Sequence, residues 1–373
     1  MSVGAGRSPR TSGSAPRCAL TALLTGLVLA GFSGARAVDS TVDPAPGGPD
    51  CRLGATRFVP LPLLPVAISE RGEVLGIDAA RRAARWRPRS GLEELPLPPG
   101  FERAEPVALN AHGAVVLVAI AGAGSEERRR AYVVSAGRLI GLGGLGARPF
   151  RIDERGRIAG EAVLGTAGRS EPVLWVLPPA DPRGRAADVE RTRLSLADEL
   201  APTPLADCCG GTAKLLDGHG GAAGDLYDAA GHFHAVRWHA GAPAERLRVG
   251  ERYSSALAMN RRGAVLLVEF PRIWLAGSQG LEPLTLAPHG PSHPHALNDC
   301  EMLVGDYGPY SDAARAFVWS RAQGFIDLNT RVDLPPGWTL KSALDVNDRG
   351  EIVGRAELPG DIERGFLIEP AGP

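Results

Sequence analysis

A ten-residue turn phrase recurs seven times along this chain and limits its possible folds more than any other feature. In each copy an Asn, Asp or Ser follows an apolar residue, and the turn closes three residues later, on a glycine in all copies but one. The copies are AISERGEVLG from Ala67, ALNAHGAVVL from Ala108, RIDERGRIAG from Arg151, LLDGHGGAAG from Leu215, AMNRRGAVLL from Ala258, ALNDCEMLVG from Ala296 and DVNDRGEIVG from Asp345. The glycine positions are 41, 43, 64, 43, 38 and 49 residues apart, with Glu301 in place of glycine once. Recurrence at this spacing indicates a repeat architecture.

The phrase is typical of a tight hairpin between two strands. Asn and Asp hydrogen-bond to their own backbone in such turns, and glycine takes the positive φ that closes them. Five copies carry a second glycine inside the following strand, at Gly76, Gly160, Gly224, Gly305 and Gly354. A glycine within a strand indicates a bulge or a close approach of another backbone.

Each repeat carries two further segments with the character of short strands. The first ends in tryptophan in five repeats, at Trp86, Trp175, Trp238, Trp274 and Trp319. The second is short and mostly apolar, as in RLIGL from Arg138, RLSL from Arg193 and FIDL from Phe325. We therefore expect four short β-strands in every repeat.

The last repeat ends after GFLIEPAGP and lacks a fourth strand, whereas RFVPLPLLP from Arg57 has that strand's pattern and precedes the first turn phrase. This split repeat predicts an all-β fold: a seven-bladed β-propeller of four-stranded antiparallel blades, in which the N-terminal strand completes the last blade. Ring closure leaves few open sheet edges. An open seven-repeat solenoid is the alternative, but it gives no reason for the split repeat.

The turn phrases alternate with segments such as HAVRW, and this pattern resembles the HAF-repeat family of extracellular repeat proteins. The resemblance covers most of residues 58–369 and implies a β-propeller-like repeat fold and export, with no assigned biochemical role. The chain departs from the family's naming motif, because its histidine position holds His234 in one repeat and arginine in four others. Those arginines are Arg82, Arg130, Arg315 and Arg364. The position is therefore interpreted as structural.

The N-terminus has the order of a secretory signal peptide. Arg7, Arg10 and Arg17 precede an apolar run over residues 19–32, and Ala35-Arg36-Ala37 follows it. Cleavage is expected after Ala37. An uncleaved anchor is the alternative, but the run is shorter than the roughly 20 residues that span a bilayer, so the mature form is expected to have no membrane span. The predicted organisation is a signal peptide (1–37), a lead segment (38–57) and one propeller (58–373), with an insertion within about 178–212.

Cleavage would leave four cysteines, Cys51, Cys208, Cys209 and Cys300, in an oxidising compartment, periplasmic or extracellular. Disulfides are therefore expected, and all three pairings stay open. No C-x-x-C spacing is present, so no thiolate metal site is predicted. Histidines gather in two places, at 219–239 and 289–295, and a turn or solvated-loop role is the preferred interpretation over a metal or proton-relay role.

The composition excludes some partner classes. With 41 basic and 42 acidic residues the net charge is −1, which argues against nucleic acid as a partner. No nucleophile elbow, phosphate-binding loop or dinucleotide fingerprint occurs, so no cofactor is predicted. Arginines at 81–89 and 128–130 are interpreted as solvated strand ends. We expect a monomer.

In such a propeller the second-to-third and blade-to-blade loops share one face, and here they are the longer ones. Long loops on a rigid scaffold are the usual place for binding groups. The candidate ligand-binding residues on that face are Phe101, His295, Asp306, Tyr307, Tyr310 and Trp338. Phe101 and Trp338 end matching Pro-Pro-Gly-aromatic segments, which favours packing between blades, whereas Tyr307 and Tyr310 have no equivalents in other repeats.

The sequence therefore predicts a binding or interaction propeller that recognises an envelope protein or a glycan through its long-loop face. The alternative is a propeller hydrolase or lyase whose active site is assembled at the central axis from several blades. Such a site leaves no linear motif, and no catalytic residue can be assigned. Acidic and histidine side chains that converge at the axial mouth would favour the enzyme.

Overall fold

The structure is a computed structural model of the chain. It describes residues 52–164, 168–178, 198–200, 203–205, 210–239, 242–247, 253–286, 290–309 and 313–371. All of them belong to one compact unit, which spans Pro49–Pro373. The expected signal peptide lies outside the described residues and stays a prediction.

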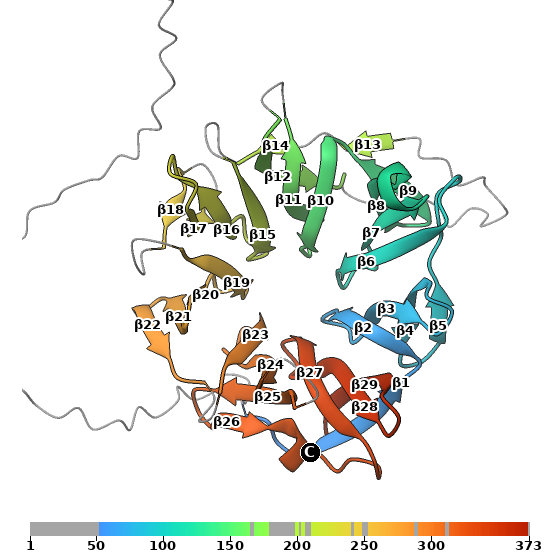
Figure 1. The fold of residues 1–373 in the computed structure, drawn as a ribbon, viewed down its shortest axis with the longest axis vertical. Helices are drawn as coiled ribbons and strands as arrows, with labels where there is room; N and C mark the ends of the chain where they lie inside the picture. Colours follow the sequence, from blue (N-terminus) through green and yellow to red (C-terminus); the bar gives the residue numbers. More distant parts are fainter. Residues whose placement is uncertain are drawn as a thin grey trace, which may run out of the picture. The chain divides into compact units, whose positions relative to one another are not determined.

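Seven antiparallel sheets stand around a central axis, with their first strands innermost (Figure 1). Blade 1 contains β2 (Leu63–Ile68), β3 (Val74–Asp78), β4 (Ala83–Arg87) and β5 (Gly91–Glu94). Blade 2 contains β6 (Arg103–Leu109), β7 (Val115–Ala121), β8 (Arg128–Ser135) and β9 (Arg138–Leu142). Blade 3 contains β10 (Leu145–Ile152), β11 (Arg157–Val163), β12 (Ser170–Val176) and β14 (Thr203–Pro204). Blade 4 contains β15 (Gly211–Leu216), β16 (Ala222–Tyr227), β17 (Phe233–Trp238) and β18 (Glu245–Arg246).

The remaining three blades close the ring. Blade 5 contains β19 (Ser255–Met259), β20 (Val265–Glu269), β21 (Arg272–Gly277) and β22 (Gly280–Leu284). Blade 6 contains β23 (Ser292–Leu297), β24 (Leu303–Tyr307), β25 (Arg315–Ser320) and β26 (Gly324–Asp327). Blade 7 contains β27 (Thr339–Val346), β28 (Ile352–Leu358), β29 (Ile362–Pro370) and β1 (Thr56–Leu61). Two 3₁₀ turns, η1 (Gly124–Glu126) and η2 (Leu328–Thr330), complete the described elements.

The N-terminal strand β1 is the outermost strand of blade 7, where it pairs antiparallel with β29 from Thr56 opposite Pro370 to Leu61 opposite Gly365. This confirms the predicted seven-bladed ring and its closure. The ring is held by apolar cores between neighbouring blades. One such core joins Val304 and Val318 of blade 6 to Ile352 and Phe366 of blade 7.

The strand glycines sit opposite a bulge that every first strand carries. At Gly354 a Cβ would lie 2.1 Å from the carbonyl oxygen of Ser342, and at Gly305 it would lie 2.2 Å from that of His293. Both interpretations of these glycines, bulge and close approach, are therefore correct. The bulge brings a carbonyl so close that no side chain fits.

The insertion after β12 differs from expectation in one respect. Residues 198–200 form β13, which pairs in parallel with β9 and adds a fifth strand to blade 2. The fourth strand of blade 3 is β14 at 203–204, and not the RLSL segment from Arg193, which lies outside the described residues. The inserted segment therefore adds a strand, β13, to blade 2 before the chain forms β14, the fourth strand of blade 3.

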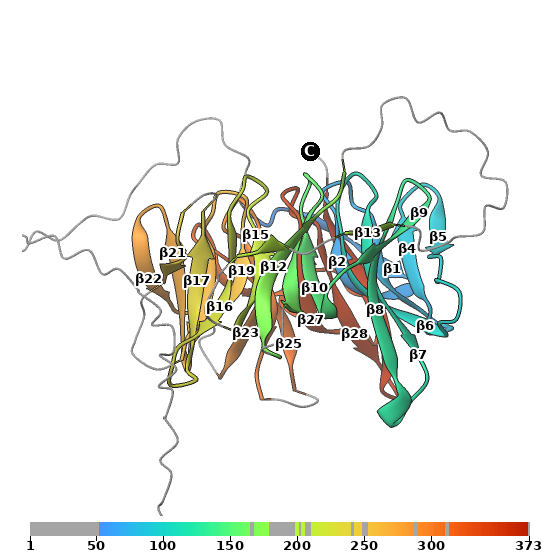
Figure 2. The same ribbon diagram turned by 90° about the horizontal axis from the view of Figure 1, so that it is seen from above.

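The two faces of the ring differ. The turn face carries the first-to-second and third-to-fourth connections. The long-loop face carries the second-to-third and blade-to-blade connections, and the β7–β8 hairpin with η1 projects furthest from it, at the lower edge of Figure 2.

Candidate functional site

On the turn face, the first-to-second turns are tied to one another by side chains. Asn110 Oδ1 accepts the backbone N–H groups of His112 and Ala114 at 3.1 and 3.0 Å, and so closes its own turn. Its Nδ2 donates to the carbonyl of Asp153 in the next blade at 3.0 Å. Equivalent blade-to-blade bonds run from Asn260 to Asn298, from Asn298 to Asn347 and from Asn347 to Ser69. An amide can accept within one turn and donate to the next, whereas a carboxylate can only accept.

A second set of hydrogen bonds is made by the residue that follows the Asn, Asp or Ser of each turn phrase. Four carboxylates accept a backbone N–H from the preceding blade's turn: Glu154 from Ala111, Asp299 from Arg261, Asp348 from Asp299 and Glu70 from Asp348. We call Glu70, Glu154, Arg261, Asp299 and Asp348 the axial mouth. Arg261 joins it as a cation, since it forms ion pairs with Asp299 and Asp348.

The axial mouth concentrates negative charge. Burial raises the pKa of Glu70; Arg261 opposes this, while Glu154, Asp299 and Asp345 add to it. These four residues belong to four other blades, so their charges meet near the axis. The carboxylates are nevertheless used in blade-to-blade bonds, which gives them a structural role whatever else they do.

One ion pair crosses the ring. Arg151 on β10 of blade 3 reaches Asp345 on β27 of blade 7, with 3.8 Å between Nη2 and Oδ1, and these blades are not neighbours. The Asp345 side chain is only 4% exposed, and its Oδ2 also accepts the N–H of Ile68 at 3.0 Å. Burial raises the pKa of Asp345 above its usual value, against the opposing effect of Arg151. The sequence held a signal for this pair, because Arg151 and Asp345 are the only charged residues at the first position of the seven turn phrases.

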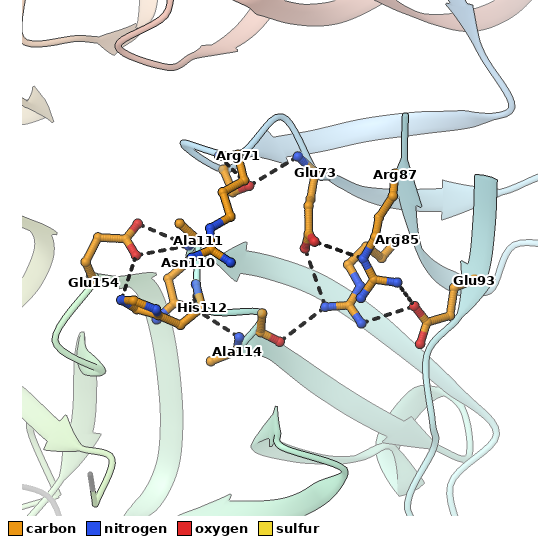
Figure 3. Close-up of polar contacts among 12 residues, drawn as sticks. Arg71, Glu73, Arg85, Arg87, Glu93, Asn110, Ala111, His112, Ala114 and Glu154 are labelled. Carbon is orange, nitrogen blue, oxygen red and sulfur yellow. Dashed lines mark hydrogen bonds and ion pairs between the residues drawn. The ribbon is translucent and has the colours of Figure 1, made fainter. Parts of the chain in front are cut away.

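Arginine side chains also link blades 1 and 2 on the turn face (Figure 3). Arg85 is 9% exposed and donates to the carbonyl of the next blade's turn glycine, Gly113, at 3.2 Å. It pairs with Glu93 at 3.1 Å, and Arg87 pairs with Glu73 at 2.8 Å. The interpretation of residues 81–89 as solvated strand ends is therefore wrong for Arg85. Arg237 makes the same bond to the turn glycine of blade 5, Gly263, at 3.1 Å.

On the long-loop side, two predicted site residues lie together. Asp306 accepts hydrogen bonds from His295 Nε2 at 2.6 Å, from His293 Nδ1 at 2.9 Å and from Ser342 Oγ of blade 7 at 3.0 Å. Although burial acts to raise it, these bonds hold the pKa of Asp306 below its usual value. The carboxylate stands between the serine and the histidine, so this is not the Ser-His-Asp order in which His activates the hydroxyl.

A matching arrangement in blade 4 explains much of this cluster. Asp225 occupies the position that Asp306 has in blade 6, pairs with Lys214, and accepts Ser255 Oγ of blade 5 at 2.9 Å. In both places a carboxylate on the second strand holds the serine of the next blade. Asp306 therefore joins blades 6 and 7, and His295, with a side chain 34% exposed, is the accessible member of its cluster.

The other predicted ligand-binding residues either make packing contacts or lie outside the described residues. Tyr307 donates to Asp327 at 3.0 Å and packs edge-on against Phe325, so its contacts are structural. Trp338 packs edge-on against Phe58 at 5.1 Å, and Phe101 packs in the core between blades 1 and 2. Trp338 also packs against the core that blades 6 and 7 share, so both residues match the interblade packing that the Pro-Pro-Gly-aromatic segments favour. Tyr310 lies outside the described residues.

The cysteine predictions fall mostly outside the described residues. Cys51, Cys208 and Cys209 are not described, and Cys300 lies half-buried in the turn between β23 and β24. The disulfide pairing stays a prediction.

A group of aromatic rings on the long-loop face is absent from the residues predicted from the sequence. Within the described part of the chain, three tyrosine or phenylalanine side chains are exposed: Tyr227 and Tyr253, each 48%, and Phe270, 84%. All three lie at long-loop ends of blades 4 and 5. Tyr227 and Tyr253 have no counterparts in the other repeats, so the criterion that selected Tyr307 would have selected them too.

Histidines border these rings. His234 Nδ1 accepts from Arg246 at 2.7 Å, and since a guanidinium only donates, Nε2 carries the proton and donates to Asp228 at 2.9 Å. The hydrogen bonds from His234 and from the backbone N–H of His232 lower the pKa of Asp228 far below its usual value. His234 is buried, and its contacts fit the structural role proposed for its position.

Among the residues that the structure describes, no three His, Cys, Asp or Glu side chains come together in a way that would hold a metal ion. Within the same residues no helix is both long enough and apolar enough to cross a bilayer.

The sequence matches no family model and no curated protein. Solved propellers resemble the fold. A prolyl endopeptidase structure matches 85% of this chain at 13% identity and a TM-score of 0.50, and the match spans about half (47%) of that protein. The β-propeller domain of the Trilobed protease from Pyrococcus furiosus matches 80% of this chain and 89% of its own at 7% identity and a TM-score of 0.48. The BP39L lectin from Burkholderia pseudomallei matches 86% and 98% at 11% identity and a TM-score of 0.45. At such identities these likenesses concern the fold alone.

Proposed function

We propose that this protein is an exported binding propeller that recognises an envelope protein or a glycan through its long-loop face. One observation carries the proposal: the exposed tyrosine and phenylalanine side chains of the described residues all lie on that face. Buried polar groups of the turn face, by contrast, are largely used in bonds between blades. Rigid, partly exposed aromatic rings are typical anchors of binding surfaces.

The proposed location and state follow from the sequence. The charged, apolar and small-residue order of residues 1–37 supports export with cleavage after Ala37, to the periplasm or the cell exterior. Ring closure by β1 supports a monomer, because the last blade needs no strand from a second chain.

A hydrolase or lyase with an axial site is the second candidate, and the axial mouth favours it. Carboxylates of four blades converge there, and Glu70 and Asp345 both have raised pKa values, as a general acid requires. The turn-face bonds of these same carboxylates favour the structural interpretation. Replacement of Glu70 by Gln would distinguish the two, since an enzyme loses turnover on any substrate found while a binder keeps its ligand.

Site-specific photo-cross-linking tests the proposed face. A photoreactive residue replaces Ile362, which is 43% exposed on the long-loop face, or the exposed Arg349 on the turn face as the matched control. The mature proteins are expressed in the native host, irradiated and analysed by mass spectrometry. We expect a stoichiometric adduct, protein or glycan, at 362 and none at 349. An adduct confined to position 349 would refute the proposed face.

A further inference from the structure

Tyr227, His232, Phe233 and Tyr253 form one contiguous aromatic cluster, here called the blade 4 patch. Tyr253 precedes β19, Tyr227 ends β16 and Phe233 begins β17, so three strand ends contribute. The Tyr253 ring packs edge-on against His232 at 4.9 Å and tilted against Phe233 at 5.1 Å. Tyr227 packs edge-on against Phe233 at 6.4 Å.

These contacts orient the exposed rings before any ligand arrives. Edge-on packing against His232 and tilted packing against Phe233 fix the plane of the Tyr253 ring, and a ring held in this way loses little conformational entropy on binding. Phe270 offers a contrast, since it is 84% exposed and has no aromatic neighbour among the described residues. The blade 4 patch is therefore a preformed aromatic surface, whereas Phe270 is a solitary exposed ring.

The charge at its edge restricts the ligand. Asp228 is fixed by the N–H groups of Ala230 and His232, both at 2.9 Å, and by His234. Arg246 occupies the Nδ1 of His234, so the ring donates to Asp228 through Nε2. The carboxylate beside the rings therefore keeps its negative charge, and it repels a carboxylated, sulfated or phosphorylated ligand while it accepts hydrogen bonds from hydroxyl groups.

We infer that the blade 4 patch binds a neutral glycan. This inference rests on the proposed function and names the ligand class of the same face. A pyranose ring has one face lined by C–H groups and a rim of hydroxyls. The C–H face would pack on Tyr253 and Tyr227, since the ring faces carry negative quadrupole charge and attract the weakly positive hydrogens. The hydroxyl rim would meet Asp228 and the tyrosine O–H groups.

The test compares wild-type mature protein with Tyr253→Ala, Tyr227→Ala and Phe270→Ala on an array of neutral and acidic glycans, followed by calorimetry on the best hit. We expect binding to a neutral glycan, a loss of about tenfold or more in affinity for each tyrosine variant and no loss for Phe270→Ala. Tyr253→Phe should keep most of the affinity, which separates ring packing from misfolding, and all variants should show the wild-type unfolding midpoint within a few degrees.

Three results would overturn the inference. The first is no glycan binding up to millimolar concentration. The second is a preference for acidic glycans, and the third is glycan binding that both tyrosine variants retain. The proposed function fails separately: if position 362 still cross-links a protein partner while no glycan binds, the long-loop face stands as a binding face and only the neutral-glycan assignment falls.

Discussion

At the scale of single residues, several buried charged groups fix blades against one another, among them Arg85, Asp225 and Asp345. Asp345 is the sharpest case, because it is a buried carboxylate whose counterion, Arg151, comes from across the axis. Sequence analysis could not identify this pair from either repeat alone, because only ring closure brings repeats 3 and 7 face to face.

Asp345 makes stability depend on pH. Its pKa is raised in the fold, so the folded state holds a proton that the unfolded chain has released, and stability from this group is full at acid pH and falls as pH rises from about 4 through the raised pKa. Asp345→Asn keeps an oxygen acceptor for Ile68 and removes the titration. Chemical unfolding from pH 4 to 8 should show a flatter profile for this variant. An unchanged slope would refute the assignment.

A second substitution at position 345 separates the effect of the hydrogen-bond acceptor from the effect of the charge. Asp345→Ala leaves the buried N–H of Ile68 without an acceptor, and we expect a loss of about 1–3 kcal/mol in the free energy of unfolding at every pH. Denaturant titration of the Asn and Ala variants side by side measures this difference. Equal stabilities of the two variants would show that the hydrogen bond contributes nothing.

Gly354 tests the explanation of the strand glycines. A methyl group there meets the Ser342 carbonyl at 2.1 Å and the Phe366 ring at 2.5 Å, so Gly354→Ala should cost about 1–3 kcal/mol or prevent folding. Gly54, with ordinary φ and nothing within 4 Å of an added methyl group, is the control. Gly54→Ala should change the unfolding midpoint little. A tolerated Gly354→Ala would mean that the bulge can move.

At the scale of elements, the strands could be predicted because each repeat restates the same pattern, and seven copies average out local ambiguity. The prediction failed where the pattern was interrupted. The insertion after β12 separates the third and fourth strands of blade 3, and its RLSL segment matched the strand pattern although β14 takes that place. Pairing of β13 with β9 is a contact between repeats, which a within-repeat pattern cannot show.

The closing strand β1 should carry measurable stability. Phe58 packs against Trp338 and Phe366, and because it is only partly buried, Phe58→Ala should cost about 3 kcal/mol, the lower end for such truncations. Phe270→Ala is the exposed control and should change stability by no more than about 0.5 kcal/mol. Equal unfolding curves for the two variants would contradict a stabilising role of β1 in closing the ring.

The chain just before β1 also favours one disulfide. Leu53 exchanges hydrogen bonds with Gln323 at 2.6 and 3.3 Å, and Arg321, in the same turn as Gln323, pairs with Glu301 beside Cys300. We therefore predict a Cys51–Cys300 bond and, by elimination, a Cys208–Cys209 pair. Non-reducing peptide mapping of the exported protein checks both, and Cys51 recovered as a free thiol would refute them.

At the scale of the whole molecule, the number of blades and the closure of the ring could be predicted from the sequence, but the candidate site could be predicted only in part. His295 and Asp306 do lie together, and Phe101 and Trp338 pack as expected. Tyr307 proved structural. The axial mouth was missed because it gathers side chains from separate blades, whose proximity exists only after the ring has closed. The blade 4 patch was missed because its rings come from the ends of three strands, although Tyr227 and Tyr253 meet the criterion that selected Tyr307.

A hydrogen-exchange footprint of the mature protein with its captured ligand decides whether the long-loop face binds, since it reports both faces of the ring at once. We expect slower exchange at residues 226–233 and 253–256 on the long-loop face, with the turn phrases unchanged. Protection confined to the turns around Glu70, Asp299 and Asp348 would contradict this expectation and would place the functional site at the axial mouth.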